Sequence, residues 1–198
     1  MTNDFLFDCD SLRRSIIFLL QEKCSIQSNN RLKFLAGKVC TLEKYLSEHN
    51  TFAMDLCLPL LFNLEAQNQF LLENESCCIF SIQLKDILVI DDSTFIFTNP
   101  SYVKSLDCNG ILSFNSPFSR TEFCSPEILA LKQIPASVTR KTFYYSLGAL
   151  LIYCITKCKS YTCDADLECL KSIKKTKLYW TILRLVCVEP SKRSFLYV

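Results

Sequence analysis

The sequence predicts a mainly helical α+β domain that contains one small β-hairpin. Apolar residues recur at helical spacing through the first third of the 198 residues, two short runs of strand type follow, and apolar helical segments return toward the C-terminus. Helices, a hairpin, a loop and further helices in this order are typical of an α+β domain. A chain of this length is long enough to bury a core, so we expect one domain with at most a small extension.

Apolar stripes predict the first helices. Residues 12–20 carry one stripe, residues 35–46 carry a second that ends in the polar stretch Ser47–Asn50, and residues 60–72 carry a third, with Pro59 suited to its first turn. The second stripe consists of Leu35, Val39, Leu42, Tyr45 and Leu46. All three stripes have the spacing of one buried helix face.

The period changes in the middle of the chain. Ile87–Ile90 and Thr94–Thr98 predict a β-hairpin, and Asp91 and Asp92 are most simply its turn residues. Residues 99–124 contain prolines and a glycine and show no sustained period, so we expect a long ordered loop. Loops of this length within compact domains are more often functional or regulatory than accidental.

Helical patterns then return, and the longest of them is strongly apolar. The expected helices span residues 126–132, 143–158, 167–174 and 178–188.

The composition argues for a folded protein without a nucleic-acid partner. Hydrophobic residues make up 49% of the chain and aromatic residues 12%, which is typical of a globule with a core. The 22 basic and 20 acidic residues give a net charge of +2, so nothing in the balance calls for nucleic acid or acidic lipid. A small basic patch is expected to be a solvated face, with docking of an acidic partner as the alternative; it consists of Lys171, Lys174, Lys175 and Lys177.

The thirteen cysteines are expected to be reduced thiols. Residues 1–10 have no cationic signal-peptide region, and the apolar run Ile16–Leu20 is too short to cross a bilayer, so we expect no membrane association and a cytoplasmic or nuclear location. The densest group has no CxxC pair, and the single histidine, His49, is remote in sequence. Buried or idle thiols are therefore expected instead of a metal site, with zinc as the lesser alternative; the group is Cys154, Cys158, Cys163 and Cys169.

Three stretches resemble the helical C-lobe of protein kinases. Cys124–Glu127 resembles the Ala-Pro-Glu that closes an activation segment, Tyr144–Gly148 opens a helix similar to the buried central helix, and Glu189–Arg193 looks like Asp-Pro-x-x-Arg. They occur in the family's order and at about its spacing. The resemblance covers residues 41–198, which leaves residues 1–40 as a helical N-terminal extension and the N-lobe absent. The overall similarity is to divergent kinase-like proteins of large DNA viruses, and in architecture also to non-catalytic C-lobe modules that bind actin-nucleating proteins.

The resemblance implies that the catalytic positions have been replaced. Ser81 stands where the family has its catalytic Asp, Asp86 takes the place of the magnesium-binding Asn, and Asn99 takes the place of the Asp in Asp-Phe-Gly. Phosphoryl transfer depends on positioning and on metal ions that neutralise charge. Ser81 has no carboxylate to accept a proton, and Asn99 offers only a neutral oxygen to a hard cation. With three glycines in the chain there is no glycine-rich loop either, so we expect no enzyme, no cofactor and no metal.

The resemblance also implies a structural ion pair. In the family, the Glu of Ala-Pro-Glu pairs with the Arg of Asp-Pro-x-x-Arg, and these positions are Glu127 and Arg193 here. Arginine suits a buried bidentate pair. Phe143 replaces the Asp that braces the catalytic loop in the family. The scaffold residues are thus kept and the catalytic ones are not.

The resulting hypothesis is a catalytically inactive, kinase-like (pseudokinase) domain that acts as a protein–protein interaction or regulatory module, in the host cytoplasm if viral. A structural or assembly component, for instance of a virion, is the alternative, and a residual nucleotide-binding enzyme that uses Asp86 is a third. Candidate partner-binding residues are Tyr102, Phe114 and Phe118 in the 99–124 loop, unless these rings simply pack the loop down. His49 is expected to be a capping or solvated residue, and Cys77 and Cys78 to be buried thiols.

Overall fold

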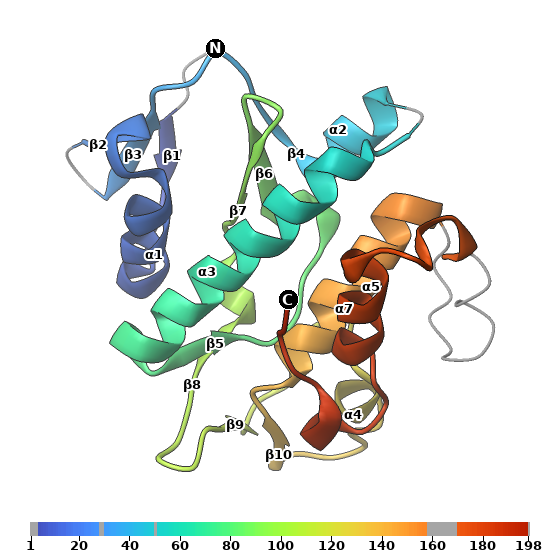
Figure 1. Ribbon diagram of the computed structural model, residues 1–198. Helices are drawn as coiled ribbons and strands as arrows, with labels where there is room; N and C mark the ends of the chain where they lie inside the picture. Colours follow the sequence, from blue (N-terminus) through green and yellow to red (C-terminus); the bar gives the residue numbers. More distant parts are fainter. Residues whose placement is uncertain (1–3, 28–29, 50, 158–169, 198) are drawn as a thin grey trace.

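The computed structural model describes residues 4–27, 30–49, 51–157 and 170–197 (Figure 1). It has the mixed helix and strand content of an α+β protein, with small antiparallel sheets. The helices are α1 Asp10–Leu20, α2 Leu42–Glu48, α3 Cys57–Glu75, α4 Pro126–Leu129, α5 Thr142–Thr156 and α7 Lys177–Leu185. The strands are β1 Asp4–Leu6, β2 Cys24–Ile26, β3 Arg31–Phe34, β4 Val39–Thr41, β5 Cys77–Ile79, β6 Ile87–Ile90, β7 Thr94–Phe97, β8 Val103–Ser105, β9 Ile111–Phe114 and β10 Ala136–Thr139.

Helix α3 lies at the centre of the molecule. It packs against α1 on one side and α5 on the other, with strand β7 behind it in the view of Figure 1. The edge of β7 that does not pair with β6 is covered by amide side chains from α3. Gln67 accepts a hydrogen bond from Phe97 N at 2.8 Å and donates one to Phe97 O at 2.9 Å, and Asn63 accepts one from Phe95 N at 2.9 Å. The helix thereby supplies the pairing that a further strand would give, and no unpaired edge is left there.

The predicted hairpin is confirmed. Strands β6 and β7 pair antiparallel, with Ile87 opposite Phe97 and Ile90 opposite Thr94. The loop between the strands is Asp91–Ser93; Asp91 and Asp92 both have positive φ, and Ser93 N donates a hydrogen bond to Ile90 O at 3.2 Å. Asp91 does more than turn the chain, because its Oδ1 accepts hydrogen bonds from Gly37 N and Lys38 N, each at 2.9 Å. These bonds fix the segment that leads into β4.

The prediction of a helical extension over residues 1–40 is only partly correct. Among the residues described there, α1 and a 3₁₀ turn at Gln21–Lys23 are helical, whereas β1, β3 and β2 form a three-stranded antiparallel sheet. Strand β3 alternates exposed and buried residues, but over four residues this pattern is too short to stand out in the sequence. The second stripe also divides, because residues 39–41 form β4 and only residues 42–48 are helical.

Residues 1–40 are closely attached to the rest of the chain. Strand β4, which straddles the expected boundary, pairs with β6, so that Cys40 lies opposite Val89. Helix α1 packs along α3, and Gln67 of α3 donates a hydrogen bond to Ser15 Oγ at 3.1 Å. The N-terminal segment is therefore part of the core and not an appendage.

Residues 99–124 contain more regular structure than the sequence predicted. Strand β8 pairs with β5, and β9 pairs with β10, which was not predicted at all. Each partner lies far away in the sequence, so no local turn signal announces the pair. Helix α4 also ends at Leu129, earlier than expected. Of the helix expected over residues 167–174, only residues 170–174 are described, and they contain a 3₁₀ turn at Lys171–Ile173.

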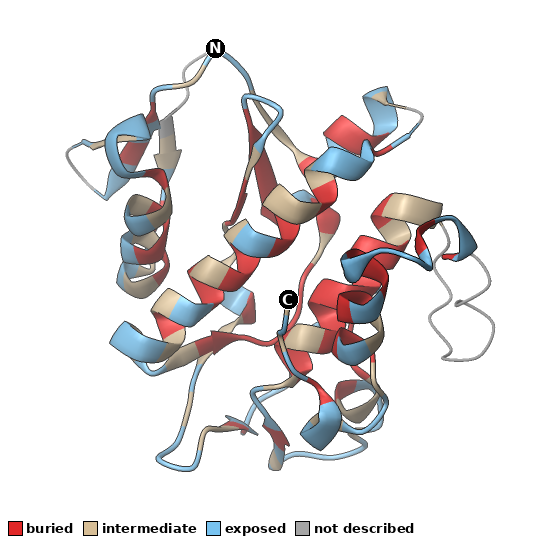
Figure 2. Cartoon of the chain, in the orientation of Figure 1, coloured by how far each residue is buried: buried red, intermediate tan, exposed pale blue. Residues whose placement is uncertain are grey.

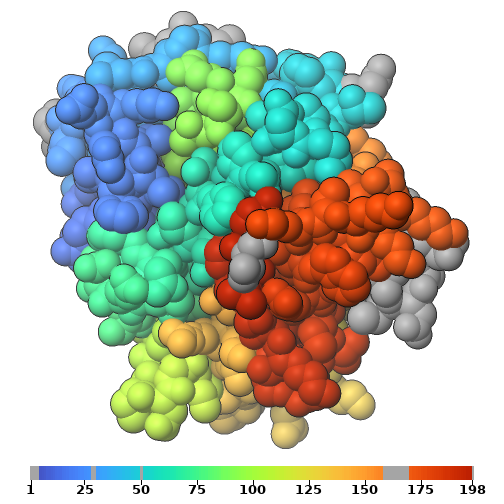
Figure 3. All heavy atoms as spheres, in the orientation of Figure 1, coloured from blue at the N-terminus to red at the C-terminus, as the bar shows by residue number. Residues whose placement is uncertain are grey.

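Helices α5 and α7 build the C-terminal half of the core. Figure 2 shows α5 as the most completely buried of the long helices, which agrees with its strongly apolar sequence. Gly148 of α5 lies against the end of α7, where an added Cβ would come within 2.6 Å of Val186 Cγ1 and 2.9 Å of Leu185 Cβ. The C-terminal segment then returns to α3, and Figure 3 shows the red end of the chain against this helix. Phe62 of α3 contacts Phe195 and Tyr197 edge to face.

Candidate functional site

The hairpin brings together Asp86 and Asn99, two of the three positions that the resemblance aligned with catalytic residues of kinases. Asp86 ends a 3₁₀ turn just before β6, and Asn99 follows β7, so antiparallel pairing places them at the same end of the hairpin. Asn99 Nδ2 donates a hydrogen bond to Asp86 Oδ1 at 3.0 Å. A neutral amide therefore faces the carboxylate where two metal-binding groups would stand in an active kinase of the type that the sequence resembles.

The surroundings of Asp86 disfavour the charged form of its carboxyl. Its side chain is buried, and Oδ2 has no hydrogen-bond partner among the residues that the structure describes. Burial raises the pKa of this carboxyl, and the hydrogen bond from Asn99 offsets only part of the rise. An isolated carboxyl with a raised pKa is a weak ligand for a divalent cation.

Ser81 does not join this pair. Its hydroxyl lies 2.6 Å from Thr121 Oγ1 and 3.2 Å from Cys124 Sγ, in a fully buried cluster. The thiol and the two hydroxyls hydrogen-bond to one another, and none of them carries a carboxylate. Ser81 thus links residues 77–82 to the segment before α4 instead of facing a substrate.

An open cavity of about 500 Å³ lies beside Asn99. Its walls come from residues 83–85, 99–102 and 117–119, and Lys85 is the one charged residue that lines it. Across residues 4–27, 30–49, 51–157 and 170–197, no group of three histidine, cysteine or acidic side chains is placed to hold a metal ion. The cavity has room for a ligand, and Lys85 places a positive charge on its wall.

The candidate partner-binding aromatics turn inward. Tyr102, Phe114 and Phe118 surround the buried ring of Phe80 edge to face, with centroids 5.6, 5.1 and 5.6 Å away. Tyr102 and Phe114 are buried, and Phe118 is only half-buried. Tyr102 and Phe114 are therefore not exposed to a partner, which corrects that expectation and agrees with the alternative that the rings pack the segment down. Of the three, only Phe118 reaches the surface.

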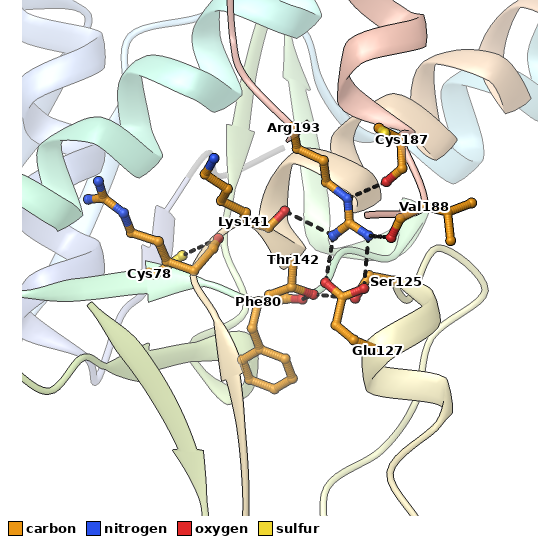
Figure 4. Close-up of polar contacts among 10 residues, drawn as sticks. Cys78, Phe80, Ser125, Glu127, Lys141, Thr142, Cys187, Val188 and Arg193 are labelled. Carbon is orange, nitrogen blue, oxygen red and sulfur yellow. Dashed lines mark hydrogen bonds and ion pairs between the residues drawn. The ribbon is translucent and has the colours of Figure 1, made fainter. Parts of the chain in front are cut away.

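Glu127 and Arg193 are paired in the structure (Figure 4). Arg193 Nη1 lies 2.5 Å from Glu127 Oε1 and Nη2 lies 2.9 Å from Oε2, the forked arrangement that guanidinium and carboxylate favour. The remaining donors bind the backbone carbonyls of Cys187, Val188 and Lys141. All five N–H groups of a fully buried arginine are thus satisfied.

This arginine joins three parts of the chain. Glu127 belongs to α4, Lys141 precedes α5, and Cys187 and Val188 follow α7. Ser125, which precedes α4, and Thr142, the first residue of α5, share a hydrogen bond of 2.6 Å between their hydroxyl groups. The two links hold α4 against the start of α5.

Glu65 of α3 is a buried acid that the sequence analysis did not single out. It lies within the apolar stripe of residues 60–72, which is the signal that could have found it. Its Oε1 accepts a hydrogen bond of 3.5 Å from Tyr144 Oη, and its Oε2 is buried with no partner among the residues described. Burial raises the pKa of Glu65 from 4.5 to about 7, against the smaller opposing effects of Tyr144 and Arg140.

The Glu65→Gln substitution should therefore stabilise the protein in a pH-dependent way. Between about pH 4.5 and 7 the unfolded chain loses the Glu65 proton while the folded chain keeps it, so wild-type stability falls as the pH rises through this window. The loss levels off above pH 7 at about 3 kcal/mol, from 1.4 kcal/mol per pKa unit. Urea unfolding should give the variant a clear advantage at pH 8 and almost none at pH 4.

Glu73→Gln is the matched control, because Glu73 lies on the exposed side of the same helix. It should change the free energy of unfolding by no more than about 0.5 kcal/mol at either pH. Parallel pH profiles for Glu65→Gln and the wild type would contradict the raised pKa.

The remaining candidates have structural surroundings. His49 Nδ1 lies 2.8 Å from Tyr45 O at the end of α2, in keeping with a capping histidine. Cys78 is buried, and its Sγ contacts the carbonyl of Arg140; burial raises the pKa of its thiol. The basic patch of residues 171–177 is exposed. Three members of the cysteine group, Cys158, Cys163 and Cys169, lie outside the residues described, and Cys154 is buried.

No protein-family model matches the sequence, and no curated protein is similar enough to it to count as a match. Among the helices that the structure describes, none has the length and apolar character needed to span a membrane.

Proposed function

We propose that this chain is a catalytically inactive, protein-kinase-like module that acts by binding another protein. The observation that carries the proposal is the contact between Asp86 and Asn99. It supports the alignment with a kinase C-lobe, because two positions that would bind magnesium in that family meet at the end of the hairpin. It also supports inactivity, because the pair consists of one buried carboxyl and one neutral amide.

The surroundings of the pair favour the same conclusion. Ser81, at the position of the catalytic Asp, is engaged with Thr121 and Cys124 and has no carboxylate with which to activate a hydroxyl. The ion pair between Glu127 and Arg193 keeps the scaffold that the resemblance implies. A protein that keeps the scaffold ion pair but has Ser81 and Asn99 where active kinases have carboxylates is best suited to binding.

Phosphoryl transfer is the activity to exclude. With γ-labelled ATP, magnesium or manganese, and casein as acceptor, we expect the wild type to incorporate no more label than the Asp86→Ala variant. Asp86 is the one carboxyl at the replaced positions, so it is the residue on which residual activity would depend. Incorporation by the wild type that disappears in Asp86→Ala would overturn the proposal.

A further inference from the structure

A second hollow lies on the far side of Phe118, between two irregular segments. Residues 117–120 form one wall and residues 131–134 the other, and they enclose about 500 Å³. Arg120 Nη2 donates a hydrogen bond to Leu131 O and ties the walls together. Phe118 packs on Phe114, with ring centroids 4.4 Å apart, and through it on the core. We call this hollow the 117–134 groove; these contacts join its two walls to each other and to Phe114.

Most of the side chains that line the groove are apolar. Pro117, Phe118, Leu131 and Ile134 line it. Ile134 is 40% exposed, although it is a large apolar side chain. A cavity of this volume accommodates a leucine, isoleucine or phenylalanine side chain, whose burial would cover this apolar surface.

The charge around the groove has one sign. Arg120 and Lys132 line it, and no acidic residue does. Within the described parts of the chain, Lys132 takes part in no ion pair. Of the nearest acids in sequence, Glu127 is paired with Arg193, and Glu122 lines a separate pocket with Glu43 and Lys85. The groove is therefore complementary to an acidic ligand.

Three backbone N–H groups in the wall formed by residues 131–134 have no partner within the described part of the chain. Among the hydrogen bonds found for the described residues, none uses the backbone N–H of Lys132, Gln133 or Ile134. Backbone donors along an irregular wall suit a ligand that carries regularly spaced carbonyl oxygens. An extended peptide has this property, and a compact small anion does not.

We propose that the 117–134 groove binds an extended acidic peptide segment of a partner protein, with a leucine, isoleucine or phenylalanine side chain in the apolar cavity and carboxylates beside Arg120 and Lys132. The inference rests on the proposed function, since it names the kind of partner that the module takes. Phe118, the half-buried member of the aromatic cluster, forms part of the floor.

Selection from a displayed library of random peptides, about twelve residues long, tests this assignment on the intact protein. We expect enrichment of peptides that combine several acidic residues with a large apolar one. Synthetic copies should bind roughly tenfold or more weakly to Lys132→Glu and to Ile134→Asp, and more weakly as ionic strength rises. Lys33→Glu makes the same charge change at an exposed position on β3 and should leave binding unchanged.

Three results would overturn the assignment of the groove as a peptide site. These are no enrichment, enrichment of basic or neutral peptides, and acidic peptides that bind Lys132→Glu and Ile134→Asp as tightly as the wild type. Circular dichroism of each variant shows that a loss of binding is not a loss of folding. A failed peptide selection would not change the outcome of the phosphoryl-transfer assay. Phosphoryl transfer by the wild type would likewise not change whether acidic peptides bind the groove. The two proposals can therefore fail separately.

Discussion

Replacing Arg193 with alanine should lower the free energy of unfolding by about 3–5 kcal/mol, the usual effect of breaking a buried ion pair. The substitution leaves the Glu127 carboxylate without its partner and three backbone carbonyls, of Cys187, Val188 and Lys141, without their donor. It also empties the volume of a fully buried side chain. Glu127→Ala should be similarly harmful, because the guanidinium then stays buried without a counter-charge.

The double mutant should cost much less than the sum of the two single mutants, since the second substitution removes a group that the first has already stranded. Arg193→Lys should also destabilise, because an ammonium group has three donors and cannot form the fork. Lys192→Ala is the neighbouring control. Its ion pair with Glu189 joins side chains that are 70% and 54% exposed, and its loss should leave the free energy of unfolding nearly unchanged. If Arg193→Ala unfolds in urea like Lys192→Ala, the buried network is not formed.

Phe80→Ala should have an effect of similar size, about 3–5 kcal/mol, as is typical for truncation of a buried phenylalanine. The ring of Phe80 is buried among Tyr102, Phe114 and Phe118, and all three contacts are edge to face. Removing it leaves a cavity lined by three rings and takes away the support of the 99–124 segment. Urea unfolding monitored by circular dichroism measures the loss.

Phe18→Ala provides the comparison for Phe80. Phe18 also lies against another ring, that of Phe70 at 4.9 Å, but its side chain is 51% exposed. Its truncation removes little buried surface and leaves no enclosed cavity, so we expect a loss of no more than about 1 kcal/mol. Equal losses for the two variants would contradict the burial of the Phe80 cluster.

The elements that the sequence predicts well are those whose signals are local. The hairpin of residues 87–97 has two short apolar runs around an Asp-Asp turn, and both parts of the signal lie within eleven residues. The long apolar stripes of α3 and α5 exceed the length at which chance patterns compete. Their extents, residues 57–75 and 142–156, lie close to the predicted ones.

The missed elements depend on partners far along the chain. Strands β5 and β8, β9 and β10, and β1 to β3 are three or four residues long, and each is stabilised by a neighbour that no local pattern identifies. The contacts of the candidate site also depend on residues that are far apart in the sequence. The family resemblance placed Glu127 beside Arg193, whereas composition and spacing give no reason to pair residues so distant. The inward packing of Tyr102 and Phe114 around Phe80 follows from tertiary structure alone.

Nucleotide binding tests the central claim most directly, because a kinase-like protein without magnesium ligands or a glycine-rich loop should not hold ATP. In a thermal melt with 1 mM ATP and excess magnesium, a site with a dissociation constant near 10 μM would add roughly 2.7 kcal/mol of stability and raise Tm by several degrees. We expect no rise in Tm for the wild type and the same Tm for Asp86→Ala with and without nucleotide. A rise of several degrees in the wild type that is absent in Asp86→Ala would contradict the account.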